Sequence, residues 1–254
     1  MKEELESFGT KRFEQRRQEI IRLISQDGCP ICRACNDALE RQWFWFFSES
    51  YGEGSGVSKY INYYGFCEKH TLEMARRGPP WQKSAIYSWI IDNKLPKLED
   101  TLKALEQQTP IGNNPMATYL GLRGLKRKIE PVNPKGSCLL CDTLEDASKR
   151  VLVDMIMVLD DLEVGKLFRK SNGLCMKHFF NALDYIKPEY FTGLLELVAV
   201  QIARLKELKK DFDEYFRKGD YRFANEPKGR EQTAWIRAVK RFIGEVGDTK
   251  SELV

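Results

Sequence analysis

The feature that most constrains this chain is a short phrase that it contains twice. GFCEKH holds Cys67 and His70, and GLCMKH holds Cys175 and His178. These are the only two histidines among 254 residues. Because a Cys-x-x-His pair can place a sulfur and an imidazole nitrogen on one metal ion, each phrase is a candidate half of a metal site.

A second pair of cysteines precedes each phrase. Cys29 and Cys32 lie upstream of the first, and Cys138 and Cys141 lie upstream of the second. The Cys-x-x-Cys pairs are 109 residues apart and the Cys-x-x-His pairs 108 residues apart. A fixed spacing of this kind indicates an internal repeat. We therefore expect two homologous halves.

The residue types predict the metal. One Cys-x-x-Cys and one Cys-x-x-His pair together supply three thiolates and one imidazole, a tetrahedral set that zinc accepts readily. Grouping the pairs within each half predicts two closed sites and two zinc ions. The expected ligands are Cys29, Cys32, Cys67 and His70 in the first site, and Cys138, Cys141, Cys175 and His178 in the second.

Two other chemistries compete with zinc. Cys35 follows Cys32 by one helical turn and would give an iron-sulfur cluster a fourth thiolate, but Leu144 occupies the matching position in the second copy. Cys-x-x-Cys pairs at helix starts also suit thiol redox chemistry, because the helix dipole favours thiolate. The simplest alternative is that these are ordinary buried cysteines.

The hydrophobic pattern predicts an all-α fold with no strands. Each metal site is expected to organise one helical half, and the halves to pack into one body. The segments 53–65 and 163–173, if extended, are long enough to return the chain to its own Cys-x-x-Cys pair. Helices are expected at 2–26, 33–51, 82–107, 142–162, 189–217 and 230–244, with short ones after each Cys-x-x-His pair. The expected divisions of the chain are 1–108, 109–137 (a linker), 138–216 and 217–254.

Composition narrows the class of protein. The charged N-terminus lacks the apolar stretch of a signal peptide, and clustered cysteines without an export signal favour a reducing, cytoplasmic location. The longest apolar run, 151–159, is too short to span a bilayer. A net charge of +4 does not favour nucleic-acid binding, since dedicated binders concentrate a larger excess on one face.

Enzyme activity is not favoured either. With both histidines used as ligands, none remains for acid-base catalysis. Four protein ligands also close a zinc site to substrate. The sequence therefore favours a metal-binding protein with structural sites, whose surface serves a protein or small-molecule partner; the oligomeric state stays open.

The duplicated CPxC and GFCxxH motifs, together with a C-terminal stretch containing KGDYRFANEP, resemble a family of uncharacterised prokaryotic proteins. The second Cys-x-x-Cys pair departs from the motif in having Leu139 in place of proline. The resemblance implies a role for the KGDYRFANEP stretch. Its polar residues Asp220, Tyr221, Arg222 and Glu226 form either a clamp for a ligand or a capping loop for the last helix.

That last helix, in the stretch REQTAWIRAVKRFIGE, carries an apolar stripe. The stripe includes Trp235, Val239, Phe242 and Ile243. Because an amphipathic helix normally buries its apolar side, we expect the helix to dock on the protein body through this stripe.

Overall fold

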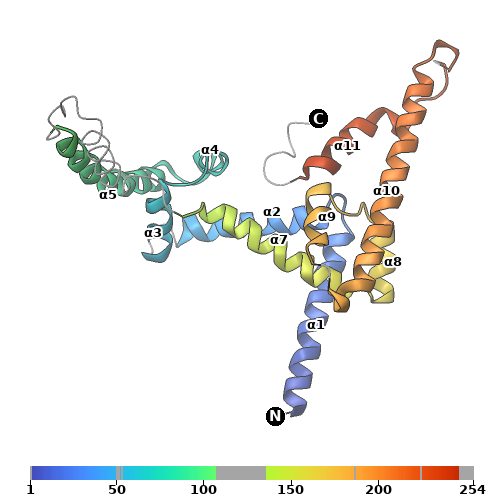
Figure 1. Ribbon diagram of the computed structural model, residues 1–254, viewed down its shortest axis with the longest axis horizontal. Helices are drawn as coiled ribbons and strands as arrows, with labels where there is room; N and C mark the ends of the chain where they lie inside the picture. The colour runs from blue at the N-terminus through green and yellow to red at the C-terminus, as the bar shows by residue number, and fades with distance from the viewer. Residues whose placement is uncertain are drawn as a thin grey trace, which may run out of the picture. The chain divides into compact units, whose positions relative to one another are not determined.

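The computed structural model describes residues 2–49, 52, 54–106, 136–185, 187–223 and 225–245, which form α-helices, short 3-10 helices and turns (Figure 1). No strand occurs within these residues, so the predicted all-α class is confirmed. The α-helices are α1 (Lys2–Ile24), α2 (Pro30–Ser48), α3 (Gly54–Tyr63), α4 (Glu68–Arg76), α5 (Pro80–Glu106), α7 (Leu139–Val158), α8 (Leu162–Lys170), α9 (Met176–Leu183), α10 (Phe191–Lys218) and α11 (Ala234–Ile243). The 3-10 helices are η3 (Pro188–Tyr190), η4 (Tyr221–Phe223) and η5 (Arg230–Thr233).

The same order of elements occurs twice along the chain. A helix that begins at a Cys-x-x-Cys pair, α2 or α7, is followed by a short helix, α3 or α8. A helix that begins at a Cys-x-x-His pair, α4 or α9, comes next, and a long helix, α5 or α10, completes each set. Each metal-ligand pair therefore lies at the first turn of a helix.

The segments whose reach was estimated as extended chain contain helices instead, so the chain does not follow the extended return path. Residues 54–63 form α3 and residues 162–170 form α8. The start of α8 is fixed by Asp161, whose Oδ1 accepts hydrogen bonds from the backbone N–H groups of Glu163 and Val164 at 2.9 and 3.0 Å. A helix advances about 1.5 Å per residue against about 3.3 Å for extended chain, so these segments reach less far than predicted.

Two compact units divide the chain in an order that differs from the predicted division. Unit 1 comprises residues 1–40 and 144–254, and unit 2 comprises residues 41–143. The chain passes from unit 1 to unit 2 within α2 and returns within α7. Most of the predicted linker, residues 109–135, lies outside the described residues.

Unit 1 has an aliphatic core. Helix α8 packs against α1 and α10, while α11 packs against α9 and α10 (Figure 1). Leu23, Ile31, Leu152, Phe168 and Leu197 are almost completely buried there. The cysteines of its metal-ligand pairs belong to the same buried cluster, so this core surrounds the ligands directly.

Unit 2 has an aromatic core instead. Trp43, Phe46, Tyr60 and Phe66 are buried, and the ring centroids of Phe46 and Phe66 lie 5.4 Å apart in an edge-to-face arrangement. Such contacts stabilise aromatic pairs beyond simple area burial. Phe66 immediately precedes Cys67, so this cluster fixes the chain just before a metal ligand.

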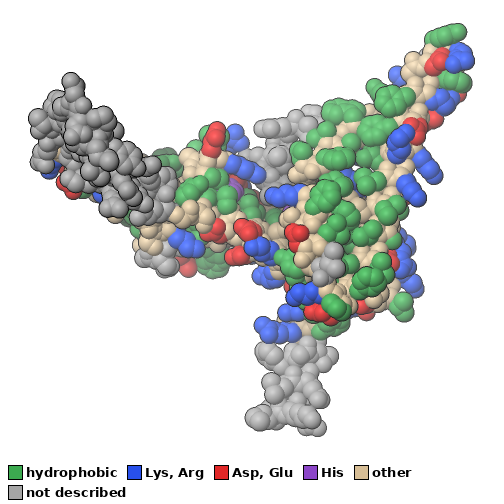
Figure 2. Space-filling view, in the orientation of Figure 1, with side chains coloured by type: hydrophobic (Ala, Val, Ile, Leu, Met, Phe, Trp, Pro, Cys, Tyr) green, Lys and Arg blue, Asp and Glu red, His purple; other side chains and the backbone are tan. Residues whose placement is uncertain are grey.

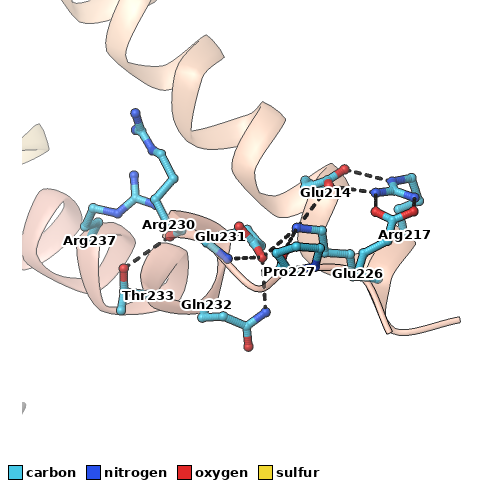
Figure 3. Close-up of polar contacts among 11 residues, drawn as sticks. Glu214, Arg217, Glu226, Pro227, Arg230, Glu231, Gln232, Thr233 and Arg237 are labelled. Carbon is cyan, nitrogen blue, oxygen red and sulfur yellow. Dashed lines mark hydrogen bonds and ion pairs between the residues drawn. The ribbon is translucent and has the colours of Figure 1, made fainter. Parts of the chain in front are cut away.

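Ion pairs tie the loop after α10 to that helix (Figure 3). Arg217 pairs with both Glu214 and Glu226, and Lys218 pairs with Glu231 at 3.1 Å. Glu231 is buried and accepts the backbone N–H of Gly229 at 2.7 Å. That bond, more than any other interaction, lowers the pKa of Glu231 to about 2.

The polar residues of the KGDYRFANEP stretch make local contacts. Asp220 and Arg222 pair with each other at 2.6 Å, and Tyr221 is 86% exposed. Glu226 faces Arg217 on α10. These contacts are local to the loop and to the end of α10.

A pair of substitutions on α8 tests the core of unit 1. Replacing Phe168, which is completely buried, by alanine should lower the free energy of unfolding by about 3–5 kcal/mol. Replacing Leu162, which is 82% exposed on the same helix, should change it by less than about 0.5 kcal/mol. Denaturant titration measures both values, and equal losses would contradict the packing described.

Candidate metal centres

The eight predicted ligands form two groups, but the grouping within each repeat is wrong. Cys29, Cys32, Cys175 and His178 lie together in unit 1, and Cys67, His70, Cys138 and Cys141 lie together in unit 2. Each Cys-x-x-Cys pair therefore meets the Cys-x-x-His pair of the other repeat. We call the first group site 1 and the second group site 2.

The path of the chain explains this exchange. Cys29 and Cys32 begin α2 in unit 1, but α2 ends in unit 2, where Cys67 and His70 follow. Cys138 and Cys141 begin α7 in unit 2, and α7 delivers the chain to unit 1. With helices α3 and α8 in place of extended returns, each Cys-x-x-His pair stays in the unit that its Cys-x-x-Cys helix has entered.

All four pairs use the same local geometry at a helix N-terminus. The carbonyl oxygens of Cys67 and Cys175 each accept the N–H of the residue four positions later at 2.8 Å. Those of Cys29 and Cys138 do the same at 3.1 and 3.0 Å. The second ligand of each pair then lies three residues into the helix, on the same side of the first turn. Free N–H groups and the helix dipole at this end favour thiolates.

Glycines before the two Cys-x-x-His pairs adopt a left-handed backbone conformation. Gly65 has φ +103° and Gly173 has φ +69°. Other residues adopt this conformation only with strain, and glycine does not. Each glycine turns the chain two residues before its ligand cysteine.

The ligand atoms of each site are spaced for one tetrahedral ion. In site 1 the Sγ atoms of Cys32 and Cys175 are 3.7 Å apart, and His178 Nδ1 lies 3.2–3.6 Å from the three sulfurs. In site 2 the Sγ atoms of Cys67 and Cys141 are 3.6 Å apart, and His70 Nδ1 lies 3.2–3.5 Å from its three sulfurs. A tetrahedron with metal–sulfur bonds of about 2.3 Å has sulfur–sulfur edges of about 3.8 Å.

The thiols of site 1 cannot all ionise without a cation. Burial raises the pKa of Cys29 to about 12, and hydrogen bonding to Cys175 raises the pKa of Cys32. The bonds that Cys175 accepts from Cys29 and Cys32 lower its own pKa. A bound divalent ion would supply the positive charge that three thiolates need.

Desolvation also acts in site 2. Although Cys141 is exposed as a residue, partial desolvation of its thiol and the neighbouring Cys138 and Cys67 raise its pKa to about 12, and burial lowers the pKa of His70 to about 4. His70 is therefore neutral at neutral pH, as a metal ligand must be. Its Nε2 is buried, and no hydrogen-bond partner reaches it among the described residues.

A C-terminal cap, formed by Gly244 and Glu245, covers site 1. The backbone N–H of Glu245 donates to Cys32 Sγ at 3.3 Å, and the Glu245 carbonyl accepts from Asn36 Nδ2 at 2.8 Å. Gly244 has φ +82°, and a Cβ there would lie 3.0 Å from Cys32 Sγ. Only glycine lets the chain approach the sulfurs this closely. Apart from the glycine itself, no sequence pattern predicts this cap.

Solvent reaches the two sites differently. All four ligands of site 1 are buried. In site 2, His70 and Cys138 are buried, but Cys67 is partly exposed and Cys141 is exposed. No segment comparable to the C-terminal cap contacts the site 2 sulfurs within the described part of the chain. Site 2 is therefore the more accessible of the two.

Cys35 lies outside both groups. It is buried, its Sγ donates to the Leu144 carbonyl at 3.6 Å, and burial raises its pKa to about 11. A protonated thiol that already has an acceptor supplies no fourth thiolate to site 1. The structure thus gives Cys35 a packing role in the core of unit 1.

The structure therefore places the chain in the class of all-α proteins with two Cys/His clusters that could hold metal ions. Residues 20–249 match a family of unknown function, DUF6062, and the chain belongs to that family. No curated protein and no solved structure matches it. Among the described helices, none is long and apolar enough to cross a membrane.

Counting metal in double variants tests the exchanged grouping. Cys29→Ala with His178→Ala should leave about one ion per chain, because both changes fall in site 1. Cys29→Ala with His70→Ala should leave none, because the changes fall in different sites. Elemental analysis measures the content, and Cys35→Ala, which should keep two ions, is the matched control. If Cys29→Ala with His178→Ala left no ion and Cys29→Ala with His70→Ala left one, the grouping expected from the sequence would be right instead.

The difference in accessibility predicts two phases of metal release to a chelator. Site 2 should release its ion first, so His70→Ala should remove the fast phase and His178→Ala the slow one. Gly244→Ala should accelerate the slow phase, because its Cβ would press on Cys32. Gly136→Ala is the control, since Gly136 has φ +88° but no heavy atom within 4 Å of its Cβ position. A single phase in the parent protein, or equal effects of the two glycine substitutions on the slow phase, would contradict the assignment.

Proposed function

We propose that this protein binds two zinc ions in structural sites that join distant segments of its chain, and that its surface serves a protein or small-molecule partner. The observation that carries the proposal is the exchanged grouping of ligands. Cys29 and His178 are 149 residues apart in sequence, and Cys67 and Cys141 are 74 apart. An ion at each site would hold these segments together only in the folded state, so binding would stabilise the fold.

The ligand spacing supports zinc over an iron-sulfur cluster. Three cysteines and one histidine at these distances suit a single tetrahedral ion. A cluster inserts several iron and sulfide atoms between its ligands and spreads them farther apart. Cys35, the candidate fourth thiolate, makes its hydrogen bond elsewhere.

The number of protein ligands at each site supports a structural role for the ions. Three thiolates and one imidazole fill a tetrahedral zinc ion, which leaves no position for substrate. In site 1 the C-terminal cap adds an N–H donor to a ligand sulfur, as partners of metal ligands commonly do. Free cysteines throughout the described chain fit the reducing, cytoplasmic location that we propose.

Apolar side chains exposed on unit 1 support a partner surface. Figure 2 shows apolar side chains gathered over α9, α10 and α11. Phe180, Leu195, Trp235, Phe242 and Ile243 are all more than half exposed on these three helices. Exposed apolar clusters on soluble proteins often mark interaction sites.

Metal analysis of protein purified without added metal and without oxygen tests this function. We expect about two zinc ions per chain and no visible absorbance. Exchange with cobalt should produce the intense visible bands of tetrahedral cobalt with thiolate ligands at both sites. Iron with acid-labile sulfide would replace the proposal with electron transfer or sensing. Fully reactive thiols without any metal would indicate thiol redox chemistry instead.

A further inference from the structure

Helix α11 presents its basic side to the protein and much of its apolar side to solvent. Arg237, Lys240 and Arg241 line a cleft in unit 1, whereas Trp235 and Phe242 are 51% and 58% exposed. This corrects the expectation that the apolar stripe docks on the protein body. Burying cations costs free energy unless partners compensate them, so the inward side of α11 needs an explanation.

The cleft has a volume of about 310 Å³ and adjoins site 1. Its walls come from the loop before α2, the loop before α9, helix α10, and the C-terminal segment with η5 and α11. Cys29 and Cys175, two ligands of site 1, also line it. The volume is at the lower end of the range for small-molecule sites.

Most of the cations in the cleft have carboxylate partners. Arg204 pairs with Glu207 at 2.6 Å and Lys240 with Glu245 at 3.2 Å. On the remaining wall, Arg230 and Arg237 share one carboxylate, that of Asp211, at 3.0 and 2.7 Å. These pairs satisfy four of the five cations that line the cleft.

Arg241 is the exception among the described residues. It has no carboxylate within ion-pair distance, and its Nη1 donates to the Leu174 carbonyl at 3.0 Å. A guanidinium offers five donors in a planar fork that matches a carboxylate or a phosphate. Gly173 lines the cleft beside it, and a Cβ there would make ordinary contact with Arg241 Nη1 at 3.6 Å.

We propose that this cleft binds a small anion whose carboxylate or phosphate group accepts paired hydrogen bonds from Arg241. The inference rests on the proposed function in one respect, because ions in site 1 would hold two walls of the cleft in place. The small-molecule partner of the proposed function would then be an anion, and the cleft would be its binding site. Of the other arginines, Arg230 and Arg237 share the single carboxylate of Asp211 and leave one positive charge in excess, while the charge of Arg204 is matched by Glu207.

Arg241 also has a simpler use, which the test must separate from anion binding. A divalent ion with three thiolates and a neutral imidazole carries one net negative charge, and Arg241 lies beside two of those thiolates. If Arg241 only balanced this charge, its removal would weaken metal binding, and added anions would have no saturable effect.

The experiment titrates the metal-loaded parent protein with inorganic phosphate and, separately, with acetate, at constant ionic strength set by sodium chloride. Calorimetry should show that at least one of the two anions binds saturably, with one anion per chain. Binding of phosphate alone or of acetate alone assigns the group that the cleft prefers. Arg241→Gln should weaken the binding about tenfold or more. Arg222→Gln, an exposed arginine paired with Asp220 outside the cleft, should leave it unchanged.

Metal content is measured in every variant, so the two proposals can fail separately. If Arg241→Gln loses the site 1 ion, Arg241→Lys keeps the charge but loses the planar fork, and it should retain two ions while binding the anion weakly. Two zinc ions in a parent protein that binds neither probe saturably would overturn the anion site and leave the zinc proposal intact. Equal binding by Arg241→Lys and the parent protein would also overturn it.

Discussion

The arrangement of this protein depends on the meeting of two helix N-terminal turns at each metal centre. One turn supplies two sulfurs, and the other supplies a sulfur and an imidazole nitrogen. The two ligand pairs of site 1 are separated in sequence by the whole of unit 2, so this site can form only after α2 and α7 have carried the chain out of unit 1 and back, whereas the ligands of site 2 all lie within the continuous segment 41–143. The ligands therefore report the path of the chain as well as its chemistry.

The two centres share ligands and spacing but differ in what surrounds them. Site 1 lies in an aliphatic core beneath a glycine cap, with an arginine-lined cleft at its side. Site 2 follows an aromatic cluster and leaves Cys141 exposed. Equivalent ligand sets thus do not imply equivalent lability. The C-terminal segment contributes most of this asymmetry, because Gly244, Glu245 and Arg241 all act at site 1.

Much of the fold and of the ligand set follows from the sequence. Helical periodicity predicts the all-α class, and the repeated Cys-x-x-Cys and Cys-x-x-His motifs select the eight residues that the structure brings together. Glycines at 65 and 173 mark the turns before two ligand pairs. The grouping does not follow, because spacing identifies pairs without choosing between two possible partners. Extended returns were assumed where Asp161 and its neighbours instead begin a helix.

The orientation of α11 could not be predicted from the sequence, because it depends on residues that are distant along the chain. Its apolar stripe resembles that of any docked amphipathic helix, and only the distant residue Asp211 on α10, which pairs with Arg237, indicates why the basic side faces inward. Long-range charge partners of this kind leave no periodic signal. Similarly, the role of Gly244 depends on its approach to Cys32, which is more than two hundred residues away in sequence.

The most direct test of the central claim is a correlation spectrum between cadmium and the cysteine β-protons in cadmium-substituted protein. Each cadmium resonance couples only to the cysteines bound to that ion, so the spectrum assigns ligands to sites without any substitution. The account predicts one resonance coupled to Cys29, Cys32 and Cys175, and another coupled to Cys67, Cys138 and Cys141. A resonance coupled to Cys29, Cys32 and Cys67 would contradict it.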